Sequence, residues 1–338
     1  MKFDSKALLA AAGLTALAFT PAYATEGGDQ ATKPGAFIGA SAGVPPPGIY
    51  MFNQVFTYQA NLVGPGTVNV LQNVLGKPPG EKTGVQAAVD VQGFLFVPGW
   101  TFLGATYDAV IAQPFVMQSL GSPINVQAAG MFNTYIAPVE LSWKLGTSGF
   151  AIKTGLGIYL DDGATTSPAT LNGPANPYYT FQPELIVSYL ANGWNLTAAM
   201  YDEINTENRV THYTTGNIFH ADFTATKTIG KWTFGPVAYY VGQITDDTCN
   251  AGCLGSTLLH PQRYDTWAVG GLIGYDFGPA SLSVWATQEV YAHAKNDAAL
   301  AAFGADPSMT TQGMTVFATL SYRLWAPEEP AKAPMFHK

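Results

Sequence analysis

The chain has 338 residues, of which 47% are hydrophobic and only 11% are charged. A soluble domain carries about 25% charged residues, so this composition favours a protein with a large lipid-facing surface. The formal net charge of −8 argues against nucleic acid as a partner.

Residues 1–24 have the pattern of a secretory signal peptide. Lys2 and Lys6 supply the positive start, residues 7–19 form a short apolar core, and residues 22–24 form a small-x-small cleavage site. No later run reaches the roughly 18 apolar residues of a membrane-spanning helix. An exported chain of this kind can still cross a membrane as a closed β-barrel, because closure pairs every backbone group.

Residues 25–48 are rich in glycine, alanine and proline and have no strand or helix period. They end in three prolines and Gly48, which favour a stiff, extended approach to the first strand. We expect this segment to fold into or under the barrel lumen and to narrow it. A disordered periplasmic leader is the alternative.

Alternating apolar and polar residues recur over residues 49–325, as expected of strands with one oily and one wet face. The alternation is clearest in residues 217–227. Each segment is long enough to cross a bilayer as a tilted strand, which takes about 9–11 residues. We predict strands at 49–60, 85–97, 100–117, 133–144, 150–160, 178–190, 194–204, 217–227, 232–246, 266–277, 281–293 and 313–324.

The connections between these strands alternate strictly between short and long. The short turns are 98–99, 145–149, 191–193, 228–231 and 278–280, and the long loops are 61–84, 118–132, 161–177, 205–216, 247–265 and 294–312. Outer-membrane barrels have short periplasmic turns and longer outside loops, whereas a soluble sandwich has no reason to place every long loop at one end. We therefore predict an all-β fold, a transmembrane antiparallel β-barrel of twelve strands over residues 49–325. Both termini would lie in the periplasm, with a periplasmic tail over 326–338.

Tryptophans support this topology, because five of the seven lie at what would be the short-turn rim. Indole prefers the membrane–water interface, so we interpret these five as a periplasmic aromatic girdle. A general preference of tryptophan for strand ends is the alternative. The five are Trp100, Trp143, Trp194, Trp232 and Trp325.

Sorting the strands by parity gives an apolar outer face, which includes Tyr135 and Trp267, and a polar inner face. Charges that face lipid cost a few kcal/mol near the bilayer centre, so we place them in the lumen. For most of them, an ion pair that fills a narrow barrel is the alternative to a ligand role. The predicted lumen-lining residues are Asp90, Asp108, Glu140, Lys153, Glu184, Glu203, His220, Asp222, Glu289, His293 and Arg323. The aromatic residues assigned to the same face are Phe94, Phe96, Phe102, Tyr239, Trp285, Tyr291 and Phe317.

Motifs for chemistry are missing from the sequence. It has no glycine-rich phosphate loop and no histidine or cysteine metal spacing, so we predict no cofactor, no metal and no catalytic residue. An outer-membrane lipase would need a serine beside an outward-facing histidine, and His220 is predicted to face inward. We expect the two cysteines, Cys249 and Cys253, to form a loop-local disulfide in the oxidising exterior, with two idle thiols as the alternative.

A known family shares five stretches of sequence with this chain, namely residues 24–28, 45–50, 208–213, 215–220 and 238–247. On these stretches the chain resembles the outer-membrane transporters associated with the meta-pathway of phenol degradation, and the likeness spans nearly the whole mature chain. This resemblance implies a barrel that admits hydrophobic aromatic compounds.

Together these features predict an outer-membrane channel for passive passage of small, neutral, mostly hydrophobic compounds. Twelve strands enclose a narrower lumen than the 16–18 of a general porin, and the acidic inner face disfavours anions. The expected partners are the outer-membrane bilayer, the barrel-assembly machinery and small hydrophobic solutes. A structural or adhesive barrel without transport is the alternative.

Overall fold

The computed structural model describes residues 30–164, 174–209, 212–249, 263–294, 306 and 308–327. Apart from one short π-helix, the regular structure of these residues is β-strand. The elements are β1 (Gly48–Val63), η1 (Thr67–Gln72), β2 (Gly84–Val97), β3 (Thr101–Phe102), β4 (Ala105–Leu120), β5 (Val126–Met131), β6 (Tyr135–Lys144), β7 (Phe150–Tyr159), β8 (Thr180–Ala191), β9 (Trp194–Asn205), β10 (Tyr213–Thr214), β11 (Ile218–Ile229), β12 (Trp232–Gln243), β13 (Thr248–Cys249), β14 (Tyr264–Asp276), β15 (Ala280–Ala294) and β16 (Thr310–Trp325).

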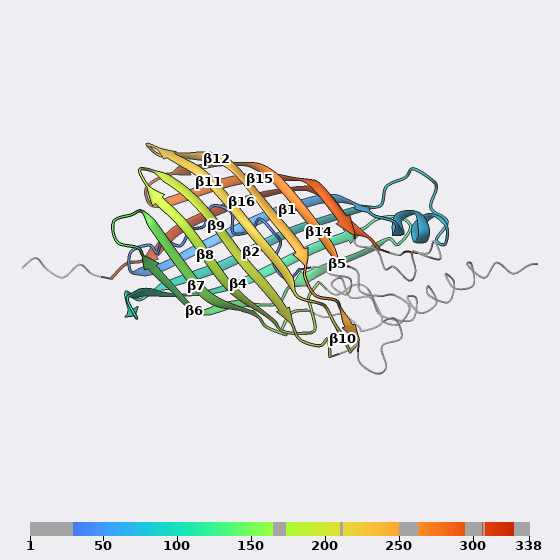
Figure 1. Ribbon diagram of the computed structural model, residues 1–338, viewed down its shortest axis with the longest axis horizontal. Helices are drawn as coiled ribbons and strands as arrows, with labels where there is room; N and C mark the ends of the chain where they lie inside the picture. Colours follow the sequence, from blue (N-terminus) through green and yellow to red (C-terminus); the bar gives the residue numbers. More distant parts are fainter. Residues whose placement is uncertain are drawn as a thin grey trace, which may run out of the picture.

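Twelve of these strands close into an antiparallel barrel, as Figure 1 shows. Each long strand pairs with its neighbours in chain order, and β1 also pairs with β16 over the full length of the seam. The ring of twelve long strands is closed in the described part of the chain, so the backbone groups of these strands pair within the barrel. The predicted all-β barrel is confirmed. Within the described part of the chain, no helix is long and apolar enough to span a membrane.

The two ends of the barrel differ, as the loop lengths predict. At the long-loop end, β4 runs on to Leu120 and pairs with β5, while η1 lies in the connection between β1 and β2. At the short-turn end, the predicted strand 100–117 is divided, because β3 forms a small hairpin with the start of β4. This end carries all five predicted girdle tryptophans, most of them exposed.

A buried carboxylate joins two connections at the long-loop end, where β10 pairs with β13. Asp247 accepts hydrogen bonds from the Gly216 N–H (2.7 Å), from Gln243 Nε2 (2.6 Å) and from the Tyr213 hydroxyl. Burial raises the pKa of the Asp247 carboxyl above its usual range, although these three donors oppose the shift.

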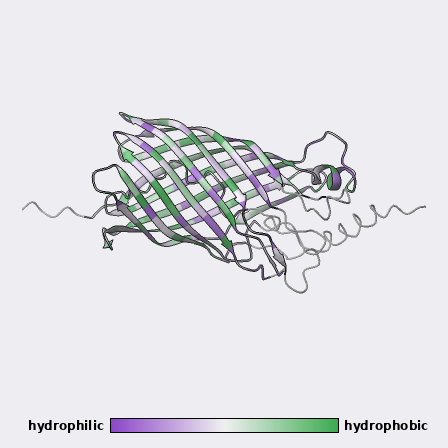
Figure 2. Ribbon diagram, in the orientation of Figure 1, coloured by the Kyte–Doolittle hydropathy of each residue, from purple (hydrophilic) through white to green (hydrophobic). Residues whose placement is uncertain are grey.

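Hydrophobic and hydrophilic residues alternate along the strands in Figure 2, and the predicted faces of β2, β6 and β15 are wrong in whole or in part. Tyr135, expected outside, is buried inside, because β6 has an irregularity between Ile136 and Val139 that shifts the parity. In β15, Val290 is an extra residue opposite β14, so His293 faces outward and is 53% exposed.

The inner and outer faces of β2 are the reverse of those predicted. Its odd residues line the lumen and its even residues, among them Asp90, Phe94 and Phe96, face outward. Asn53, on the outer face of β1, donates a 2.6 Å hydrogen bond to Asp90. This pairing reduces the cost of a carboxylate on the outer wall.

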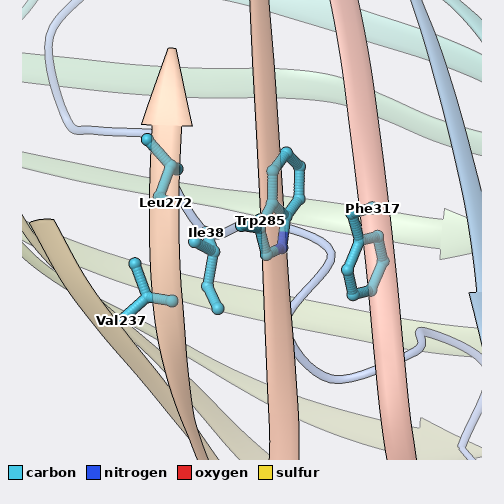
Figure 3. Packing of buried hydrophobic residues seen from close by; sticks show 5 residues of the cluster. All are labelled: Ile38, Val237, Leu272, Trp285 and Phe317. Atoms are coloured by element: carbon cyan, nitrogen blue, oxygen red, sulfur yellow. The ribbon is translucent and has the colours of Figure 1, made fainter. Parts of the chain in front are cut away.

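The core of the molecule is its lumen, and residues 30–47 lie inside it. Ile38 of this segment packs between side chains of β12, β14, β15 and β16, as Figure 3 shows. A second cluster places Phe37 on Tyr201, with ring centroids 4.6 Å apart. The wall side chains of the first cluster are Val237, Leu272, Trp285 and Phe317.

Candidate functional site in the barrel lumen

The lumen segment, residues 30–47, runs almost the whole length of the barrel. It starts at the long-loop end, where Tyr264 donates a 2.8 Å hydrogen bond to Gln30. It ends at the short-turn rim, where Arg323 donates to the Pro47 carbonyl. Because β1 begins at that rim, residues 30–47 lead to β1 from the long-loop end of the lumen.

Two wall carboxylates hold the backbone of the lumen segment. Asp222 accepts hydrogen bonds from the N–H groups of Gly35 (2.8 Å) and Phe37 (3.0 Å). Glu203 accepts from the N–H groups of Ala31 (2.7 Å) and Thr32 (2.8 Å). A segment without secondary structure has backbone donors to satisfy, and these buried carboxylates meet that need with charge-assisted bonds.

A third wall carboxylate holds the side chain of Lys33. The Lys33 ammonium lies 3.3 Å from Glu289 and 3.7 Å from the ring centroid of Tyr58. Glu289 also accepts from the hydroxyls of Tyr58 (2.8 Å) and Tyr239 (2.6 Å) and from the Gly313 N–H (2.6 Å). The wall therefore supplies negative charge and the segment supplies its counter-charge.

His220 belongs to the same inner surface. Its ring stacks on Tyr201 with centroids 4.8 Å apart, and its Nε2 lies 3.1 Å from Gln182 Nε2 and 3.6 Å from Glu203. The side chain is fully buried. It is part of the wall that packs against the segment, and no serine is among these contacts.

A second charged group lies opposite the segment. Lys153 binds Asp108 at 3.1 Å and Glu140 at 2.8 Å, and Glu184 lies close by. Strand register explains the grouping, because Asp108, Glu140, Gly155 and Glu184 occupy successive positions across β4, β6, β7 and β8. Three carboxyl groups therefore share one ammonium at this place.

A cavity of about 500 Å³ lies between the lumen segment and the barrel wall, chiefly along β1, β2 and β4. This volume falls within the range of small-molecule sites. Its wall is mainly aliphatic and aromatic, with Glu140, Lys153 and Glu184 at one place on it. The apolar lining includes Phe37, Phe52, Phe56, Val89, Val91, Leu95, Val110, Ala112, Val116, Phe132, Tyr135 and Tyr159.

The predicted site residues are thus distributed over four places. Asp108, Glu140, Lys153 and Glu184 form the acidic cluster, and Glu203, His220, Asp222 and Glu289 face the lumen segment. Arg323 is exposed at the short-turn rim. Asp90 and His293 lie on the outer wall, so their lumen assignment is wrong.

The aromatic residues that were predicted to line the lumen are likewise found both inside and outside the barrel. Tyr239, Trp285 and Phe317 are buried in the lumen, whereas Phe94, Phe96 and Tyr291 lie on the outer wall and Phe102 is exposed in β3. The sequence analysis missed the apolar lining of β2, because the odd residues of this strand are nearly all aliphatic and an apolar face was assigned to lipid.

The predicted disulfide and the predicted terminal segments involve residues that the structure does not describe, and a further prediction concerns metal sites. The proposed disulfide partner Cys253, the signal peptide and residues 328–338 lie outside the described residues. Among the residues that are described, no group of three or more histidine, cysteine, aspartate or glutamate side chains is placed to hold a metal ion.

Comparison with known proteins identifies the family. Residues 59–303 match the model of a family described as "Putative MetA-pathway of phenol degradation". The chain belongs to this family. No protein with curated function matches the sequence.

Among solved structures, an outer membrane channel from Pseudomonas putida F1 shares the architecture of this family member. The TM-score is 0.62 at 8% identity, with 86% of this chain and 99% of that chain covered. The chain therefore shares the β-barrel fold of that channel.

Two other barrels are less similar. The translocator domain of the autotransporter NalP from Neisseria meningitidis gives a TM-score of 0.43 at 8% identity, covering 83% of this chain and 90% of that one. The toluene transporter TodX from Pseudomonas putida gives 0.37 at 10% identity, covering 90% and 95%. TM-scores this low carry no argument about the architecture of this chain.

Proposed function

We propose that this barrel is a channel for passive passage of small, neutral, mostly hydrophobic compounds, aromatic ones included, across the outer membrane. The observation that supports this most is the apolar cavity of about 500 Å³ inside the lumen. Apolar pockets with few polar groups are typical of sites for small organic ligands. The channel described for the similar barrel of Pseudomonas putida F1 and the phenol-degradation family agree with this proposal.

The lumen segment is the proposed constriction of this channel. It is anchored by Glu203, Asp222 and Glu289 on one side of the barrel, and the cavity remains on the other side. Passage would follow the apolar wall of β2 and β4, past the rings of Phe52 and Phe132. Ions and sugars would find few partners on that route.

The proposal includes no catalysis. Most charged groups of the lumen wall bind one another or the segment, and we identify no nucleophile and base side by side at the cavity among the described residues. We further propose that the barrel-assembly machinery inserts this chain into the membrane. The last strand of the barrel ends on an aromatic residue, Trp325, which agrees with that proposal.

Uptake by cells tests the function. Cells of a Gram-negative host that lacks hydrophobic channels would express the wild-type chain, and the initial uptake rate of radiolabelled phenol, glucose and benzoate would be measured. An asymmetric outer membrane is needed, because hydrophobic solutes cross simple phospholipid vesicles unaided. Phenol uptake should rise over empty-vector cells, whereas glucose and benzoate uptake should stay at the background rate.

Two variants of the barrel wall, a test variant and its matched control, accompany this experiment. Val89→Glu places a charge on the apolar lining of β2, while Ala88→Glu places the same charge on the outer face next to it. The first should abolish the phenol gain and the second should retain it if the barrel inserts. Equal phenol uptake with and without the wild-type chain would favour a structural barrel with a closed lumen.

A further inference from the structure

A polar patch lies on the outer wall of the barrel. Asn53, Gln92 and Gln113 are neighbours on β1, β2 and β4, because Gln92 pairs in register with both of the others. Asp90 is the next outward residue of β2 toward the long-loop end, and it adds a carboxylate. These four residues form the polar patch.

Apolar side chains border the polar patch on both sides along the strands. Phe94 and Ile111 pair with each other next to it, on the side of the short-turn rim. Phe115 and Met117 lie next to it toward the long-loop end, and both are exposed. The patch therefore lies within the hydrophobic zone of the wall and not at its margin.

Strand geometry places the polar patch near the middle of that zone. Ile49 pairs with Trp325 at the short-turn rim, and Asn53 is four residues further along β1 (49 to 53). A tilted strand climbs about 2.5 Å per residue, so Asn53 lies about 10 Å above the tryptophan. The lipid-facing band of a membrane barrel is about 25 Å tall, so this height is close to the bilayer centre.

Other strands are apolar over the same height. The outward residues of β12 between Trp232 and Tyr240, and those paired with them on β14, include no amide or carboxylate side chain. They are Phe234, Pro236 and Ala238 on β12 and Ile273, Gly271 and Val269 on β14. Contact with lipid therefore explains the walls of β12 and β14, but it does not explain Gln92 and Asp90.

The polar patch has hydrogen-bonding groups left over. The Gln92 side chain is exposed and has no hydrogen bond with any residue that the structure describes. Asn53 gives one of its two N–H groups to Asp90 Oδ1 at 2.6 Å. Among the described residues, none donates to Asp90 Oδ2. Such groups are costly in hydrocarbon, and in membranes a hydrogen bond to another protein segment satisfies them.

We propose that the polar patch is the contact between two copies of this chain in the membrane. The patch is self-complementary, because in a two-fold arrangement Gln92 of each copy donates to Asp90 of the other. Exposed apolar side chains beside these bonds, such as Val55 and Phe115, pack around them and exclude lipid. The contact lies on the outside of the wall, so the inference does not rest on the proposed function.

Disulfide cross-linking in isolated outer membranes tests this contact. In a chain whose native cysteines are replaced by serine, Val55→Cys places a thiol opposite Asp90 in the register of β1 and β2. Val269→Cys on β14 is the matched control, because the two valines are 44% and 49% exposed. Each also lies six residues along its strand from the partner of a rim tryptophan (49 to 55 and 275 to 269).

Copper phenanthroline should convert Val55→Cys into a product of twice the chain mass, in about tenfold higher yield than Val269→Cys, because specific pairing holds the first thiol at the contact. Adding Asp90→Leu and Gln92→Leu should lower that yield about tenfold, since the hydrogen bonds between the copies are lost. The barrel itself should stay folded, as leucine suits a lipid-facing position, and heat-modifiable migration on a gel checks this. Native mass spectrometry of the unmodified chain, released from nanodiscs, should give twice the chain mass.

Four results would overturn the proposal. Equal yields for the two valine positions would mean random collision, and an unchanged yield with both leucines would mean that the polar patch does not hold the contact. A cross-linked product of any other mass would identify a different protein as the partner. A monomer mass for the unmodified chain would leave no pair at all.

Discussion

The absence of a side chain at Gly155 leaves room for two neighbouring carboxyl groups. It lies between Glu140 and Glu184 in the row of inward positions across β6, β7 and β8. A Cβ at this position would lie 2.8 Å from Glu184 Oε1 and 3.0 Å from the Glu140 side chain and the Val139 carbonyl oxygen. The two carboxylates can meet only because this residue is glycine.

Gly155→Ala should therefore destabilise the barrel, by about 1–3 kcal/mol as for other overpacked sites. The midpoint temperature of heat-modifiable gel migration measures this loss. Gly271→Ala is the matched control, since its nearest atom would be 3.9 Å away, and its midpoint should equal that of the wild type. An unchanged midpoint for Gly155→Ala would contradict this account of the row.

Asp222 is the residue on which the constriction depends most directly, because both carboxylate oxygens accept N–H groups of the lumen segment. In Asp222→Asn, an NH2 group faces one of these donors, so that donor loses its partner at roughly 1–3 kcal/mol. We expect longer openings and a higher mean single-channel conductance in planar bilayers.

Asp90→Asn makes the same chemical change on the outer wall and should leave the conductance unchanged. If both variants conduct like the wild type, Asp222 does not hold the constriction.

At the scale of the elements, periodicity and loop length were sufficient to predict the strands and their order. The physical reason is that a period of two and a strict alternation of short and long connections leave few topologies other than an up-and-down barrel. What periodicity could not predict is the parity after an irregularity. One extra residue at Val290, or the irregularity after Ile136 in β6, reverses which side chains face lipid.

The face of β2 shows a second limit. Its odd residues are aliphatic and its even residues include Asp90 and Gln92, so the rule that apolar residues face lipid assigns the strand the wrong way round. A channel for hydrophobic solutes needs a greasy inner wall, and that need competes with the lipid for the same side chains. The lumen segment has no period at all, so its course depends on wall carboxylates that lie far away in the sequence.

The whole molecule has a direction in the membrane, which surface labelling can establish. In a chain whose native cysteines are replaced by serine, Glu81→Cys lies in the connection between β1 and β2, and Lys231→Cys lies in the tight turn between β11 and β12. A membrane-impermeant maleimide should label intact cells through residue 81 only, because long loops face outward.

Lysed cells are the control, in which both positions should react. Labelling of intact cells through residue 231 alone would reverse the orientation of the barrel.

The course of the lumen segment also bears on how the ring can close. The segment directly precedes β1, and β1 forms the seam with β16. We expect the segment to be inside the barrel already when this last pair of strands closes. A ring closed on an empty lumen would bury Glu203, Asp222 and Glu289 without the partners that the segment brings, at several kcal/mol for each ion. An open sheet keeps the same carboxylates in water at no such cost. The lumen segment therefore acts as an internal template, and the strands of the wall close around it.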